Sequence, residues 1–171
     1  MAYARFYLND PCAPKPNRKI RLGANVLLIW EDKLLLEYRR DSDLWGLIGG
    51  GIKGAEPEDK AIIRETREET GIRIPKEDLV RKQVFAEPGR IVAYRDGTVH
   101  RMICLLYEVR LRQEPVLKPS RESRELRFFT GAELKTIPIA PTHIPMIELF
   151  TPGLQESGPV DSETHKGGQC L

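Results

Sequence analysis

Hydrophobic residues along the chain form short runs, separated by segments rich in Gly, Pro and charged residues. Residues 21–30 and 34–40 read as the two strands of a hairpin, with the charged turn 31–33 between them. Both strands are nearly continuous apolar runs, which indicates burial on both faces of a sheet. Residues 1–20 contain three prolines and predict only a short strand or an extended arm.

The second half of the chain has the same strand-rich pattern. Residues 72–79 read as a short strand and turn, and residues 80–88 as a further strand. Residues 90–111 predict a hairpin around an Asp-Gly dipeptide, which favours tight hairpin turns. A strand and a short helix with a threonine N-cap are expected in 122–137, and a final helix in 143–150.

A longer helix interrupts the strands. Residues 57–71 open with a proline, which fits the first helical position, and close with a glycine, which fits the left-handed residue after a helix. At about 100° per residue, Glu65, Glu68 and Glu69 fall in one sector of this helix. Isoleucine and threonine side chains fill the adjacent sector. One edge of the helix can therefore pack on a core while the next edge presents three carboxylates.

The order of these elements predicts an α/β fold. Strands before and after one helix fit a mixed sheet with helices on both faces, an α/β sandwich. From residue 151 the chain has few apolar residues and many Gly, Ser and Pro, which predicts a tail that is disordered or ordered by a partner. The sequence therefore divides into an N-terminal extension (1–20), one domain (21–150) and a tail (151–171).

Composition and charge fit this picture of one domain. The 171 residues are 40% hydrophobic and 30% charged, as in ordinary soluble globular proteins. A net charge of +2, with basic residues spread along the chain, gives no electrostatic basis for binding nucleic acid. The sequence shows no signal-peptide pattern and no apolar run near the ~20 residues of a membrane span, so we expect a cytoplasmic protein.

Cysteines and histidines show no metal-site pattern. Cys12, Cys104 and Cys170 are far apart in the sequence, and their odd number indicates reduced thiols. Cys104 lies in an apolar run and is expected in the core. His143 fits the start of a helix, and the other two histidines are expected at the surface.

The glycines 49–51 predict a turn that leads into this helix, closely before its three carboxylates, and they allow the backbone to approach a phosphate or a metal. Hard cations such as Mg²⁺ prefer oxygen ligands, often one or two carboxylates together with substrate phosphates. Such ions lower the pKa of bound water and neutralise charge during phosphoryl transfer. These residues therefore point to hydrolysis of a phosphoanhydride bond. The alternative is a solvated acidic face, in which like charges cost roughly 0.2–0.5 kcal/mol per pair and Arg64 offsets part of that cost.

The spacing in this region resembles a known signature. Apart from one position, it matches the pattern G-x5-E-x7-R-E-U-x-E-E-x-G-U, where U is a bulky aliphatic residue, and it therefore resembles the signature of the Nudix hydrolases. Thr66 replaces an aliphatic residue of the signature, and Ile48 stands where a proline is usual before the glycines. The matching positions are Gly50, Glu56, Arg64, Glu65, Glu68, Glu69, Gly71 and Ile72.

The resemblance implies a Nudix-type α/β/α sandwich with a mixed central sheet over residues 20–150. It also implies hydrolysis, with Mg²⁺ or Mn²⁺, of a nucleoside diphosphate linked to another moiety, such as ADP-ribose, a nucleotide sugar or a nucleoside triphosphate. The partner is then a small nucleotide, no membrane is involved, and homodimers are common in the family. Removal of a cap or pyrophosphate from RNA is a variant that the weak net charge disfavours. The alternative function is a Nudix-fold sensor, which binds a nucleotide without turnover.

Residue roles follow from the resemblance, position by position. Glu68 and Glu69 match the main metal ligands, and Glu65 matches a ligand or general base. Arg64 matches the arginine that orients a glutamate of the signature, and Glu56 matches a residue that supports the loop or binds a further metal. The expected catalytic residues are thus Glu65, Arg64 and Glu68.

Further site residues are expected around this helix. The carbonyl of Gly49 is a candidate metal ligand, and so is a carboxylate late in the sheet, for which Glu122 fits the position and Glu125 is its rival. An arginine can hold a phosphate bidentately, and an aromatic ring can stack on a base, although core packing is the favoured role of Trp45. The candidate substrate-binding residues are Arg39, Arg40, Trp45, Gly50 and Gly51.

Overall fold

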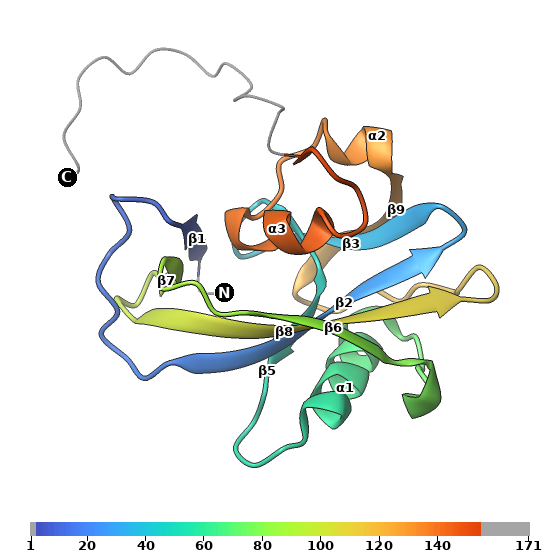
Figure 1. Cartoon of the computed structure of the whole chain (residues 1–171), viewed down its shortest axis with the longest axis horizontal. Helices are drawn as coiled ribbons and strands as arrows, with labels where there is room; N and C mark the ends of the chain where they lie inside the picture. Colours follow the sequence, from blue (N-terminus) through green and yellow to red (C-terminus); the bar gives the residue numbers. More distant parts are fainter. Residues whose placement is uncertain (1–2, 155–171) are drawn as a thin grey trace.

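The computed structural model describes residues 3–154, which form nine strands and a few helices (Figure 1). The strands are β1 (Ala4–Leu8), β2 (Arg21–Trp30), β3 (Lys33–Arg39), β4 (Trp45–Gly46), β5 (Ile48–Gly51), β6 (Val80–Phe85), β7 (Arg90–Tyr94), β8 (Val99–Leu111) and β9 (Ser123–Thr130). The helices are α1 (Glu58–Thr70), α2 (Gly131–Leu134) and α3 (Ile144–Ile147), with the short 3₁₀ helices η1 (Lys76–Asp78) and η2 (Pro141–His143).

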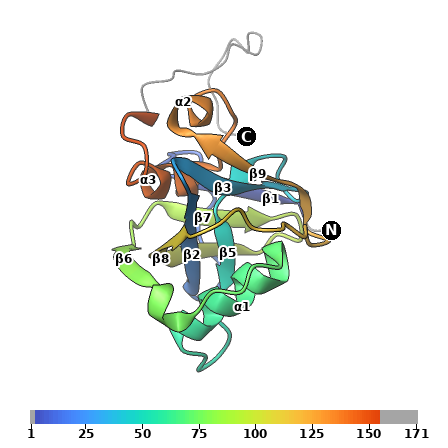
Figure 2. The same cartoon turned by 90° about the vertical axis from the view of Figure 1, so that its right-hand side faces the viewer.

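The strands form one mixed sheet between two layers of helix. Its order is β1-β7-β8-β2-β3-β4, with β5 on β2, β6 on β8 and β9 on β3. Helix α1 lies against one face, and α2 and α3 lie against the other (Figures 1 and 2). This arrangement confirms the predicted α/β/α sandwich with a mixed central sheet.

Strand β2 is the centre of the sheet and organises both faces. It runs parallel to β8 from the pair Arg21–Met102 to the pair Trp30–Leu111. The other ladders within residues 3–154 are antiparallel. Residues 23–29 of β2 are all buried, as the continuous apolar run predicts.

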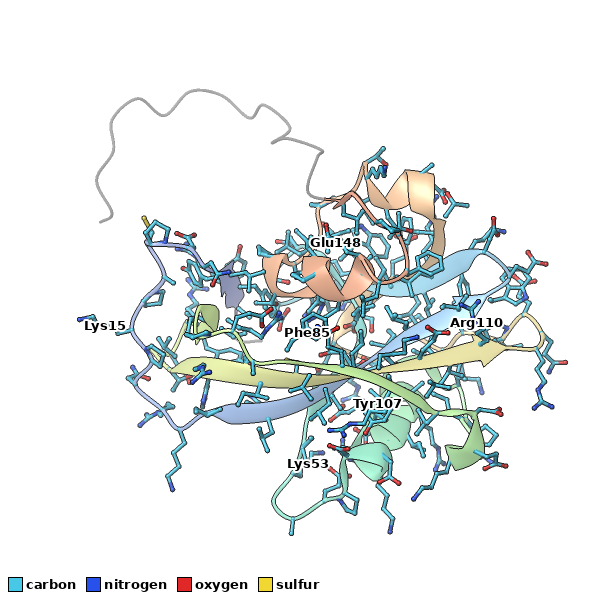
Figure 3. The ribbon with its side chains drawn as sticks, viewed as in Figure 1. Lys15, Lys53, Phe85, Tyr107, Arg110 and Glu148 are labelled. Carbon is cyan, nitrogen blue, oxygen red and sulfur yellow. The ribbon has the colours of Figure 1, made fainter. Side chains whose placement is uncertain are left out.

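Side chains of the sheet build two apolar clusters, one on each face. The cluster on the α3 side contains Leu27 and Phe85, and the cluster on the α1 side contains Leu28 and Tyr107. Figure 3 shows Phe85 and Tyr107 on opposite sides of the sheet. Successive side chains along a strand point to opposite faces, so neighbours in β2 serve different clusters.

The N-terminal extension joins the sheet. Strand β1 pairs antiparallel with β7, from Ala4 opposite Tyr94 to Leu8 opposite Arg90, which confirms the expected short strand. Ala4 is buried, and its backbone N–H donates to the carbonyl of Asp41 at 2.6 Å. The extension is therefore fixed both to β7 and to the loop after β3.

Three local predictions are corrected by the structure. The glycines 49–51 lie in strand β5 against β2 rather than in a turn. Residues 72–79 contain no strand but the 3₁₀ helix η1, because Pro75 offers no N–H to a ladder. The final helix is shorter than 143–150, because η2 replaces its start and α3 ends at Ile147.

The C-terminal segment and the cysteines also differ from expectation. Leu154 is buried in the cluster on the α3 side, so packed structure extends past residue 151. The remainder of the predicted tail, 155–171, lies outside the described residues, as do Cys170 and His165. Cys104 is a buried free thiol, as expected, whereas Cys12 is disulfide-bonded, so the expectation of reduced thiols is wrong for Cys12. In the described part of the chain, every helix is too short or too polar to cross a membrane.

Candidate active site

Helix α1 packs one face on the sheet and presents its carboxylates from the adjacent edge. Ala61, Ile62 and Thr66 are buried beneath it. The Thr66 hydroxyl donates to the carbonyl of Ile62 at 2.7 Å, and that of Thr70 donates to the carbonyl of Thr66 at 2.6 Å. A buried hydroxyl that bonds the preceding turn is satisfied, so threonine fits where the signature has an aliphatic residue. Gly71 ends the helix with φ 77°, as predicted.

Arg64 joins the acidic residues of the helix to the loop before it. Its Nε and Nη2 atoms donate to the two carboxylate oxygens of Glu56, at 2.9 and 2.8 Å. Its Nη1 donates to Glu65 at 2.6 Å and to Glu68 at 3.3 Å, and Nη2 also reaches the carbonyl of Gly51 at 3.3 Å. The hydrogen bond from Arg64 lowers the pKa of Glu56 to about 2. One guanidinium therefore fixes three carboxylates and the end of β5.

The glycines of β5 leave room for these carboxylates. At Gly50, an added Cβ would lie 2.5 Å from the carboxyl carbon of Glu65. At Gly49, where φ is 149°, an added Cβ would lie 2.2 Å from the carbonyl oxygen of Ala24. Side chains at these two positions would thus displace either the glutamate or β2.

Glu69 is the most buried carboxylate of the signature, with 6% of its surface exposed. It accepts a hydrogen bond from the backbone N–H of Gly49 at 2.9 Å. Burial raises the pKa of Glu69 well above its usual range, and the nearby negative charge of Glu37 adds to the effect. An additional positive charge in this place would stabilise the ionised form.

A cavity of about 480 Å³ opens beside these groups. It brings together most of the residues predicted from the sequence for metal and substrate binding, and it is bounded by β2, β5, β7 and β8. The predicted residues that line it are Glu65, Glu68, Glu69, Gly49, Gly50, Gly51, Arg39 and Glu122.

Two predicted substrate-binding residues do not line this cavity. Trp45 packs edge-on against Phe129, with ring centroids 4.7 Å apart, in the cluster on the α3 side. This is the core-packing alternative, and it follows from the side of the sheet to which β4 directs the indole. Arg40 instead donates from Nε to the carbonyl of Ser123 at 3.0 Å. Glu125, the rival of Glu122, is exposed on β9 and likewise does not line the cavity.

The donor set of the cavity fits a hard divalent cation. Three carboxylates and the glycine backbone supply oxygen ligands, which Mg²⁺ and Mn²⁺ prefer. Glu69 and the glycine strand are held together by a hydrogen bond, whereas the Glu68 side chain is 55% exposed and can reorient. Within residues 3–154, no three acidic, His or Cys side chains have already converged on a single ion position.

Several residues of the site were missed from the sequence. Glu37 on β3 is 1% exposed, accepts from the Ser123 hydroxyl at 2.5 Å and pairs with Arg39 at 3.3 Å. Burial raises the pKa of Glu37, although Arg39 and Ser123 oppose this shift. A charged residue inside an apolar strand run could have indicated Glu37 as a residue of the site, because buried acidic residues are rare unless they are paired.

Other missed residues come from distant parts of the chain. Arg21 and Lys53 line the cavity near the glycine strand, and neither forms a salt bridge within the described residues. Figure 3 shows Lys53 near α1, at the end of β5. Phe6 and His143 line the same cavity. Only the fold brings residues 6, 21, 53 and 143 to one cavity, so no sequence spacing could have indicated them.

Comparison with known proteins gives one family and a shared fold. A family model described as NUDIX domain matches residues 19–150. The nucleoside triphosphatase NudI of Enterobacter sp. (strain 638) is 30% identical over 95 residues, which are 54% of this chain and 66% of that protein.

Solved structures show the same architecture at low identity. A bifunctional NMN adenylyltransferase/ADP ribose pyrophosphatase of Francisella tularensis, complexed with AMP and a Mn ion, has a TM-score of 0.63 and 24% identity over 85% of this chain and 44% of its own. The NUDIX domain of Shewanella oneidensis NrtR, complexed with ADP ribose, has a TM-score of 0.60 and 20% identity over 81% of this chain and 89% of its own. The chain thus spans just under two thirds of the curated relative and less than half of the Francisella protein.

Proposed function

The chain belongs to the NUDIX domain family, and from this premise we propose that it is a metal-dependent pyrophosphohydrolase of nucleoside diphosphate derivatives. The observation that carries the proposal is the cavity in which Glu65, Glu68 and Glu69 meet the glycine strand. This combination of oxygen ligands and accessible backbone suits a diphosphate bound through a divalent cation. The relatives are named for nucleoside triphosphate and ADP-ribose pyrophosphate chemistry, which supports the same substrate class.

In this proposal Glu65, Glu68, Glu69 and the Gly49 carbonyl hold Mg²⁺ or Mn²⁺, with Glu122 as a further carboxylate on the rim. When bound, the cation supplies charge neutralisation and a lower pKa for water. Water attacks one phosphorus, the anhydride P–O bond breaks, and two phosphate products leave. Catalysis of this reaction depends mainly on positioning and electrostatics.

The chain's own residues provide that positioning. Arg64 holds Glu65 and Glu68 in place, and the N–H of Gly49 holds Glu69. The Glu65 carboxylate, which lies against Gly50, is the proposed acceptor of the proton of the attacking water. Arg21 and Lys53, at the same end of the cavity, supply positive charge for the substrate phosphates.

The decisive experiment is a hydrolysis screen with and without Mg²⁺ or Mn²⁺. The panel contains ADP-ribose, nucleotide sugars, dinucleoside polyphosphates and nucleoside triphosphates, and the readout is released phosphate or nucleoside monophosphate. Glu69→Gln should lower kcat by about 100-fold or more. Glu58→Gln is the matched control, because Glu58 lies on the same helix but pairs outward with Arg81. Full turnover by Glu69→Gln would show that the assigned mechanism is wrong.

Nucleotide binding without turnover is the second candidate function. Tight binding in the absence of metal, with no product from any member of the panel, would support it.

Homodimer formation and a cytoplasmic location remain predictions, to be checked by light scattering and cell fractionation.

A further inference from the structure

The loop that joins β8 to β9, residues 112–122, caps the C-terminal end of helix α1. The backbone N–H of Lys118 donates to the carbonyl of Thr70 at 2.8 Å, and that of Ser120 donates to the carbonyl of Glu69 at 3.2 Å. Both carbonyls belong to the last turn of α1, for which the helix itself has no N–H donors. The loop is therefore bonded to the residue whose carboxylate is the most buried of the signature.

A chain of hydroxyl groups ties the last part of this loop to strand β3. The Ser123 hydroxyl donates to Oε1 of Glu37 at 2.5 Å, and a serine hydroxyl has only one proton to donate. The Ser120 hydroxyl, whose oxygen lies 3.2 Å from Oγ of Ser123, is therefore the donor between the two serines. Its oxygen accepts from the backbone N–H of Glu122 at 3.1 Å. The hydrogen bonds thus run in one direction, from Glu122 through two serines to Glu37.

Glu37 is a fixed end for this chain of hydrogen bonds. Its other carboxylate oxygen, Oε2, accepts from Nη1 of Arg39 at 3.3 Å, and Arg39 is held in turn by two hydrogen bonds to Asp41, at 3.0 and 2.8 Å. Glu37 and Ser123 are both buried, and a buried, fully bonded network has few alternative arrangements. In the part of the chain that the structure describes, neither Glu37 nor the two serines line the cavity, so any effect on a ligand there is indirect.

Glu122 is the residue of this network that does line the cavity. Its carbonyl accepts from the backbone N–H of Arg40 at 3.0 Å, and Nε of Arg40 donates to the carbonyl of Ser123. The ladder between β3 and β9 changes register at this point, between Tyr38 and Arg39, and such irregularities redirect side chains next to active sites. The backbone of Glu122 is therefore fixed on both sides, while its carboxylate forms no hydrogen bond or salt bridge within residues 3–154.

We propose that Glu37, Ser120 and Ser123 are positioning residues, which hold the β8–β9 loop so that the Glu122 carboxylate meets a divalent cation bound by the α1 glutamates. The loop is bonded at one point to the Glu69 carbonyl and at another to buried Glu37, so the carboxylates of Glu69 and Glu122 are kept in a fixed relation. Groups that orient a metal ligand in this way strengthen metal binding. The assignment rests on the proposed function, because it takes the cavity to bind that cation.

The test measures Mn²⁺ binding to the whole protein, without turnover, from the electron paramagnetic resonance signal of the free ion. Ser120→Ala removes the middle of the hydroxyl chain and leaves the buried pair of Glu37 and Ser123 in place. The Kd for Mn²⁺ should rise about tenfold, the scale for loss of a group that orients a metal ligand. Ser120→Thr keeps the hydroxyl and should restore binding. Arg121→Gln is the matched control on the same loop, because Arg121 is exposed and does not line the cavity.

A double-mutant cycle with Glu122→Gln shows whether Ser120 acts through Glu122. If it does, the double variant should bind Mn²⁺ no more weakly than Glu122→Gln alone. Losses that multiply in the double variant would show that Ser120 affects the fold in general, and they would overturn the proposal. So would unchanged Mn²⁺ binding in Ser120→Ala or in Glu122→Gln, or no Mn²⁺ binding by the unmodified protein.

The same measurements separate this proposal from the proposed function. Mn²⁺ binding that weakens in Ser120→Ala and recovers in Ser120→Thr, without turnover of any substrate by the unmodified protein, would retain the positioning residues and refute the hydrolase. Turnover by the unmodified protein, with unchanged Mn²⁺ binding in Ser120→Ala, would do the reverse.

Discussion

Individual residues of the signature were the most predictable part of the site. Arg64, Glu65, Glu68 and Glu69 are close in sequence on one helix, so spacing alone places them on neighbouring faces. The structure adds the contacts of Arg64 with Glu65 and Glu68 and shows that the three glutamates line one cavity. Glu37 could not be linked to them from sequence, because its partner Ser123 comes from a strand much later in the chain.

Arg64→Lys should disturb the site while the fold remains intact. A lysine ammonium cannot reproduce the fork that bonds both oxygens of Glu56 and also reaches Glu65 and Glu68. We expect kcat/KM to fall by about 10–100-fold, as for other residues that orient metal ligands. Arg67→Lys, an exposed change on the same helix, serves as the control in the same assay. Equal activity of the two variants would contradict the role of Arg64.

His143 should make stability depend on pH. Burial lowers its pKa in the folded protein to about 3, below the ordinary value of 6.5, so the unfolded state binds more protons between these values. Stability therefore falls as the pH falls through 6.5, by about 2 kcal/mol between pH 7 and pH 5 from this residue. Urea unfolding at both pH values measures the effect. His143→Gln keeps an acceptor for the backbone N–H of Leu47, which donates to Nδ1 of His143 at 2.9 Å, and should remove most of the difference. The same pH slope in both proteins would refute the assignment.

At the scale of elements, prediction succeeded where a strong pattern repeats within a few residues. Helix α1 starts at Glu58 and ends before Gly71, within one residue of the expected limits. The capping box of Thr130 and Glu133 confirms the predicted start of α2. Prediction failed at residues 72–79 and 49–51, where tertiary pairing decides between strand and turn. β5 is a strand despite three glycines because β2 supplies its partner and Glu65 fills the space above it.

The glycine strand gives a prediction at this scale. Gly50→Ala should displace the Glu65 carboxylate, because the new Cβ would lie 2.5 Å from its carboxyl carbon. We expect kcat/KM to fall at least tenfold, since a shift of about 1 Å in a catalytic group can cost 100-fold. Gly54→Ala is the control: its φ is 55° and nothing lies within 4 Å of the added Cβ. That control should lose about 1–2 kcal/mol of stability and keep its activity.

For the whole molecule, the fold class was predictable, but the residues at which the folded domain begins and ends were not. The mixed sheet and the helices on two faces follow from the order of elements, whereas the packing of β1 and Leu154 depends on contacts across the molecule. Leu154 lies in a stretch with few apolar residues, so composition assigned it to the tail. Leu154 nonetheless packs in the core, in the same cluster as Leu134 and Met146.

Leu154→Ala tests whether the domain extends this far. The side chain is 6% exposed, and truncating a buried leucine costs about 2–5 kcal/mol. Denaturant unfolding should show a loss in that range. Leu149→Ala, where the leucine is 49% exposed, should cost less than half as much. Similar small losses in the two variants would place the end of the folded core before residue 154.

The parallel pairing of β2 with β8 has a consequence for how the protein reaches its native state. These strands are distant in sequence, and the chain between them contains α1 and the glycine strand. Closing so long a loop lowers the chain's entropy before the contacts that stabilise the pairing have formed, so such pairings form late and slowly. The cavity is lined by residues of β2, which precedes this segment in the sequence, and by residues of β8, which follows it. Nucleotide binding should therefore appear during refolding in the same kinetic phase as the sheet itself, and a chain still emerging from the ribosome before β8 would have the signature but no site.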